Sequence, residues 1–83
     1  LAGHGSKASI AWRSVRAQML ARSGAHDRAK QVAEEAVSLA AATDALVDHG
    51  DACLALATVL RIAGDRAGMR AAAEQAIALY ERK

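Results

Sequence analysis

The 83-residue chain contains no proline or phenylalanine, and it has one cysteine, one tryptophan and one tyrosine. The lone cysteine, Cys53, excludes an internal disulfide, and no Cys/His cluster offers a metal site. A sheet sandwich is disfavoured because its core needs the aromatic and β-branched residues that are scarce here. Apolar runs are too short to span a bilayer. A free cysteine without a signal peptide predicts a reducing, cytoplasmic location.

Alanine dominates what is present, with 23 residues in a chain that is 53% hydrophobic and carries a formal charge of +2. Since alanine is the best helix former, this composition predicts helices that pack closely through small side chains. Domains of this size bury only about 60–65% of their unfolded surface. They are therefore marginally stable unless they are cross-linked or assembled.

Glycine and polar residues divide the chain into four expected helices. Gly24 and Gly64 are natural helix stops, because glycine adopts the left-handed conformation without strain. Thr43 or Asp44 is expected to cap a third helix after the break at 42–44. The predicted helices cover about 7–23, 26–42, 44–63 and 65–82, with the third the longest. Residues 1–6 are expected to be a disordered leader or tag remnant, with a natural linker as the alternative.

An internal repeat emerges when the chain is shifted by 40 residues against itself. Several residues that are distinctive in an alanine-rich chain then coincide. The matches include Leu20 with Leu60, Gly24 with Gly64, Glu34 with Glu74 and Leu39 with Leu79. The chain is therefore predicted to be all-α, with two antiparallel helix–turn–helix hairpins at about 7–42 and 44–83.

The spacing of these residues resembles the tetratricopeptide (TPR) repeat. The first unit shows Ala17-x2-Leu20-x3-Gly24-x4-Ala29-x6-Ala36-x2-Leu39, and the second shows Ala57, Leu60, Gly64, Ala73, Ala76 and Leu79. The period of 40 exceeds the usual ~34 of the family. Long repeats of this kind look like the helical arms of large bacterial transcriptional regulators and of ATPase or nucleotide-cyclase fusion proteins. The resemblance implies a right-handed solenoid.

No catalytic, cofactor-binding or metal-binding residues are predicted, and the chain is not expected to be an enzyme. His4, His26 and His49 are scattered, and His49 is expected at an exposed helix start beside Asp48. Cys53 falls in an apolar stripe and is expected to be a buried small side chain. Residues 1–30 hold six cations and one anion, whereas residues 31–65 hold one cation and six anions. A solvated face explains this pattern best, and a patch that steers a protein partner is the next explanation. Nucleic-acid binding comes last, since no aromatic residues interleave with the cations.

Two functions are compatible with these features: a protein-interaction scaffold, and a sensor arm that binds a small effector or peptide on its concave face. In TPR-like stacks the first helix of each hairpin lines that face. The resemblance therefore implies a lining of Ala11, Ser14, Gln18, Arg22, Asp51, Leu54, Thr58 and Arg61. This mixed, shallow surface suits a protein or peptide partner.

The two terminal helices are expected to leave apolar side chains uncovered. Trp12 and Val15 lie on the first helix, and Ile77 and Tyr80 lie on the last. Repeat hairpins bury a continuous core only by stacking. A homodimer through these helices is therefore expected, most simply with two-fold symmetry.

Overall fold

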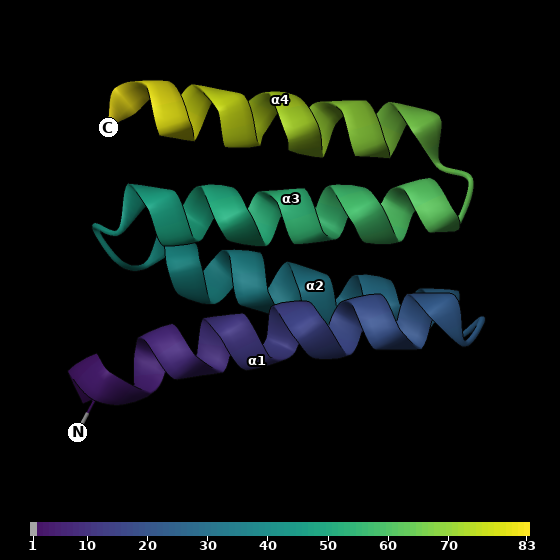
Figure 1. The fold of residues 1–83 in the computed structure, drawn as a ribbon, viewed down its shortest axis with the longest axis horizontal. Helices are drawn as coiled ribbons and strands as arrows, with labels where there is room; N and C mark the ends of the chain where they lie inside the picture. The colour runs from purple at the N-terminus through teal and green to yellow at the C-terminus, as the bar shows by residue number, and fades with distance from the viewer. Residues whose placement is uncertain (1) are drawn as a thin grey trace.

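The computed structural model describes the backbone of residues 2–83 and the side chains of residues 7–83. These residues form four α-helices and no strand (Figure 1): α1 (Ala2–Arg22), α2 (His26–Ala41), α3 (Leu46–Ile62) and α4 (Arg66–Arg82). The four helices confirm the all-α prediction for the described residues. Successive helices run in opposite directions. The backbone of α1 begins earlier than the expected start near residue 7. The predicted leader at 1–6 has side chains that lie outside the described residues.

Both predicted glycine turns are present with the same hydrogen bonds. Gly24 has φ +93° and Gly64 has φ +86°. Around Gly24, Ala25 N–H donates to the Leu20 carbonyl and Gly24 N–H to the Ala21 carbonyl. The equivalent bonds around Gly64 join Asp65 to Leu60 and Gly64 to Arg61. This is the Schellman arrangement, which satisfies the last carbonyls of a helix through a left-handed residue.

The connection between the hairpins differs from the prediction. The expected cap on α3 is wrong, because the N-cap is Ala45 and no side chain caps the helix. The Thr43 hydroxyl instead donates to the Ala40 carbonyl and accepts from Ala45 N–H, at 2.7 and 3.2 Å. This bonding holds the chain in a turn and delays the start of α3 to Leu46. With 17 residues, α3 is also shorter than α1, which has 21.

The helices form a flat assembly about two helices thick, with Cα extents of 34 × 27 × 13 Å over the described residues. In addition to the two hairpin contacts, α3 packs against both α1 and α2. Within the described residues, the backbone of α4 approaches only α3 closely. Figure 1 accordingly places α1 and α4 at opposite edges of the layer. Every helix therefore keeps one face open.

The interior is built mostly from alanine, as the composition predicts. Val59 and Cys53 are the largest fully buried side chains, and no described polar or charged residue is buried. Small side chains allow the helix axes to approach closely. Each buries little apolar area, however, and burial is worth only about 0.8 kcal/mol per CH₂ group. The buried side chains are Ile10, Ala17, Ala21, Ala29, Val32, Ala33, Ala36, Ala40, Ala52, Cys53, Ala55, Ala57, Val59, Leu60, Ala72, Ala76 and Leu79.

Substitution of Gly24 or Gly64 by valine is expected to destabilise the protein by more than about 1 kcal/mol. The cause is backbone strain alone, because a Cβ at either position would meet no atom within 4 Å. Chemical denaturation followed by circular dichroism measures the loss. Ala63→Val is the matched control, since Ala63 is exposed with φ −75°. Equal stability of the glycine variants and the control would contradict the turn assignment.

Candidate functional site

An open groove of about 440 Å³ runs between α1 and α3. It contains six of the eight residues expected on a concave face; Arg22 and Arg61 are not among its lining residues. The complete lining is Lys7, Ile10, Ala11, Ser14, Val15, Gln18, Asp48, Asp51, Ala52, Leu54, Ala55 and Thr58. The expected residues thus make up half of the twelve side chains that line the groove.

The 40-residue repeat explains why these residues face one another. Equivalent positions of α1 and α3 line the groove: Ala11 matches Asp51, Ser14 matches Leu54, and Gln18 matches Thr58. Two of the lining residues also belong to the core. Ile10 of α1 and Ala52 of α3 cluster with Ala36 and Ala40 of α2. The two walls are therefore held by the alanine-rich core.

Charged and apolar side chains lie at different positions along the length of the groove. Lys7, Asp48 and Asp51 lie in the lining, close to the start of α1 or α3 in sequence. Its apolar part includes Val15 and Leu54, which are 58% and 43% exposed. Arginines occupy the last turns of both helices. A ligand lying along the groove would meet one lysine and two carboxylates, then apolar side chains, and then guanidinium groups beyond the lining.

Asp51 also joins α3 to α4. The Tyr80 hydroxyl donates a short hydrogen bond of 2.5 Å to Asp51 Oδ1. The ring lies against Gly50, where an added Cβ would come within 2.6 Å of Tyr80 Cε1. Tyr80 was expected to be uncovered, and that expectation is wrong because Gly50 leaves space for the ring. Gly50 beside an aspartate was the only sequence signal for this contact.

A second exposed feature lies on the outer face of α1. Trp12, Val15 and Met19 are 57%, 58% and 64% exposed, as the sequence predicted for the first two. With Arg16, Leu20 and Ser23 they line a shallow depression on this helix alone. The guanidinium carbons of Arg13 and Arg16 lie 5.3 and 5.7 Å from the centre of the Trp12 ring. These distances favour cation–π attraction, so the patch combines apolar surface with positive charge.

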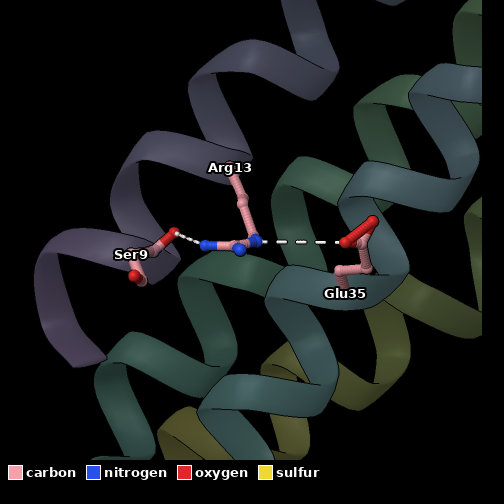
Figure 2. Close-up of polar contacts among 3 residues, drawn as sticks. All are labelled: Ser9, Arg13 and Glu35. Carbon is pink, nitrogen blue, oxygen red and sulfur yellow. Dashed lines mark hydrogen bonds and ion pairs between the residues drawn. The ribbon is translucent and has the colours of Figure 1, made fainter. Parts of the chain in front are cut away.

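Arg13 connects this patch to α2 (Figure 2). Its Nε atom lies 4.0 Å from Glu35 Oε2, and its Nη1 atom donates to the Ser9 carbonyl at 3.4 Å. Both side chains are partly exposed, so the ion pair is worth no more than about 1 kcal/mol. Its effect is to hold Arg13 near the α1–α2 boundary, beside the Trp12 ring.

The remaining reactive side chains do not converge in the described part of the chain. No group of three His, Cys, Asp or Glu residues is placed to hold a metal ion there. Cys53 is buried as predicted, and burial raises the pKa of its thiol. His49 is partly buried rather than exposed, and its Nε2 atom has no hydrogen-bond partner. The side chain of His4 lies outside the described residues.

Comparison of the chain with models of known protein families, with curated proteins and with solved structures finds no match. None of the helices in the described residues is long and apolar enough to cross a membrane. The groove and the α1 patch are therefore interpreted from their own chemistry.

The bond between Tyr80 and Asp51 predicts a loss of stability at high pH. Burial, the hydrogen bond to Asp51 and the charge of Asp51 together raise the pKa of Tyr80 to about 12, from 10.0. Because the folded value is raised, the stabilisation is complete below pH 10 and is lost as the pH rises through about 12. Since Tyr80 is the only tyrosine, tyrosinate absorbance measures its titration directly.

Tyr80→Phe is the control for this prediction. It should cost about 1 kcal/mol at neutral pH and should remove the high-pH loss that is specific to the tyrosine. Asp51→Asn should lower the pKa of Tyr80, since it removes the negative charge. An unshifted Tyr80 titration in the wild-type chain would show that the bond does not form in solution.

Proposed function

We propose that this chain is a protein-interaction module, a TPR-like repeat fragment whose α1–α3 groove binds an extended or helical segment of a protein partner. The observation that carries the proposal is the convergence of equivalent residues from two repeated helices on one open groove. Exposed Leu54 and Val15 supply apolar contact, while Ser14, Gln18 and Thr58 supply polar groups along the same walls. Segments that lie in helical grooves are recognised by this combination of apolar anchors and a polar rim.

The repeat assignment is part of the proposal. It is supported by the 40-residue self-match and by the two identical glycine turns. Right-handed solenoid stacking and membership of a larger bacterial regulatory protein, acting in the cytoplasm, follow from the resemblance of the long repeats. Neither an enzymatic activity nor a cofactor is part of the proposed function.

A sensor arm that binds a small effector is the second candidate. The groove volume of about 440 Å³ falls in the range of small-ligand sites, about 300–1,000 Å³. Such sites usually enclose most of their ligand and place a few polar groups in a buried setting. No described polar residue is buried here, which favours the protein partner.

Peptides selected from a displayed random library against the 83-residue chain test the proposal. Leu54→Lys should weaken the selected peptides about tenfold or more, because it places a charge on the apolar anchor surface. Leu39→Lys should leave binding unchanged. It is a matched control because Leu39 is similarly exposed, 37% against 43%, and belongs to a different surface.

Each new lysine follows an acidic residue by one helical turn, Asp51 or Glu35, so both helices should tolerate the change. Circular dichroism checks that the variants fold. Equal loss of binding in the two variants, or the selection of peptides that bind away from the groove in chemical-shift mapping, would overturn the assignment of the groove.

A further inference from the structure

The internal repeat pairs each residue of the first hairpin with a residue of the second, and this pairing reveals a consistent difference in exposure. On α3, the residues Ala52, Ala55 and Val59 are 0%, 6% and 0% exposed. Their counterparts 40 positions earlier are Trp12, Val15 and Met19, which are 57%, 58% and 64% exposed. The α1 patch is therefore the same helical stripe that α3 buries.

The stripe on α3 is buried because it packs on the first hairpin. Ala52 clusters with Ile10 of α1 and with Ala36 and Ala40 of α2. Val59 clusters with Ala17 and Ala21 of α1 and with Val32 of α2. By the repeat, the stripe on α1 has the position and spacing to pack on a preceding helical hairpin.

The opposite edge of the molecule shows the other half of this interface. On α2, Val37 packs against the core clusters that join α2 to α3 and α4. Its counterpart on α4 is Ile77, which is 54% exposed. Figure 1 places α1 and α4 at opposite edges of the layer. The α1 edge therefore carries the stripe that would dock, and the α4 edge around Ile77 carries the surface that would receive it.

Charge makes the α4 edge a better partner for α1 than a second α1 would be. Residues 7–22 of α1 contain four cations and no anion, and two of the cations lie over Trp12. Ile77 is flanked by exposed Glu74 and Glu81, three residues before and four after it on the same side of α4, and exposed Arg70 lies two turns before it. This edge therefore carries both signs of charge and offers carboxylates to the α1 arginines. A two-fold contact between α1 helices would instead oppose arginine to arginine.

We infer that the α1 stripe (Trp12, Val15 and Met19) and the α4 edge around Ile77 are complementary halves of one hairpin–hairpin interface, through which two copies of this chain associate head to tail. Because Trp12 and Met19 are larger than Ala52 and Val59, the hairpins of two copies lie farther apart than the hairpins within the chain. The contact is heterologous, so it leaves one free edge at each end and allows further copies to add.

The test uses one variant for each edge. Met19→Glu places an anion on the α1 stripe between Arg16 and Arg22, and Ile77→Lys places a cation on the α4 edge between Glu74 and Glu81. Met19 does not line the α1–α3 groove, so the groove is unaffected. Sedimentation velocity over a concentration series should show association of the wild-type chain, weakened about tenfold or more by either variant. The control Leu39→Lys should associate like the wild type.

Mixing the two variants distinguishes the head-to-tail contact from its alternatives. The Ile77→Lys chain retains an intact α1 stripe and the Met19→Glu chain an intact α4 edge, so the mixture should form a 1:1 dimer at concentrations where each variant alone is monomeric. The emission of Trp12, the only tryptophan, should shift to the blue in the mixture as the ring is covered.

Three results would overturn the inference. Wild-type association that survives Ile77→Lys would indicate a two-fold contact through α1. Association that survives Met19→Glu would indicate a contact between α4 helices. A wild-type chain that remains monomeric, with constant Trp12 emission up to about 1 mM, the weak end of the specific affinity range, would show that the two edges do not bind each other.

Discussion

Close packing through alanine is the constraint on which the rest of this structure depends. The helices meet through side chains that carry one methyl group, so their backbones approach closely and the molecule has no thick core to fill. Val59 and Cys53 are the largest fully buried side chains, and Ile10, Leu60 and Leu79 are buried at 5–6% exposure. Other large apolar side chains remain on the surface, where Trp12, Val15, Met19, Leu54 and Ile77 form the proposed contact surfaces.

A flat assembly of four helices leaves apolar surface exposed. The shortest Cα extent is 13 Å, the thickness of about two packed helices, because Cα atoms lie about 2.3 Å from a helix axis and packed axes lie about 8–10 Å apart. Each helix thus buries one face and exposes another. Leaving a Val, Ile or Met side chain exposed forgoes about 1.5–3 kcal/mol of transfer free energy, a large fraction of the total stability of a small domain. A partner that covered the α1 stripe, the α4 edge or the groove would recover part of this free energy.

The two hairpins share one backbone plan but differ where they meet their surroundings. Both end their first helix with the same glycine turn and the same pair of hydrogen bonds. The second hairpin is fastened by Tyr80, whose ring covers Gly50 and whose hydroxyl binds Asp51. The first hairpin is linked by Arg13 and Glu35. The repeat thus determines the backbone of both hairpins. The few positions at which the two repeats differ determine which surfaces stay exposed.

The local features of this protein were determined by its sequence. Backbone propensity and the spacing of small residues can be read from a single sequence. They determine the helices, the left-handed glycines at positions 24 and 64, the alanine core and the burial of Cys53. The six groove residues were expected from the resemblance to TPR-like stacks, in which the first helix of each hairpin lines one face. The tertiary structure alone decided the partial burial of Tyr80 and of His49 and the late start of α3 at Leu46. Each depends on space left by a residue of another helix or on a competing hydrogen bond in a turn, and neither follows from the periodicity of one segment.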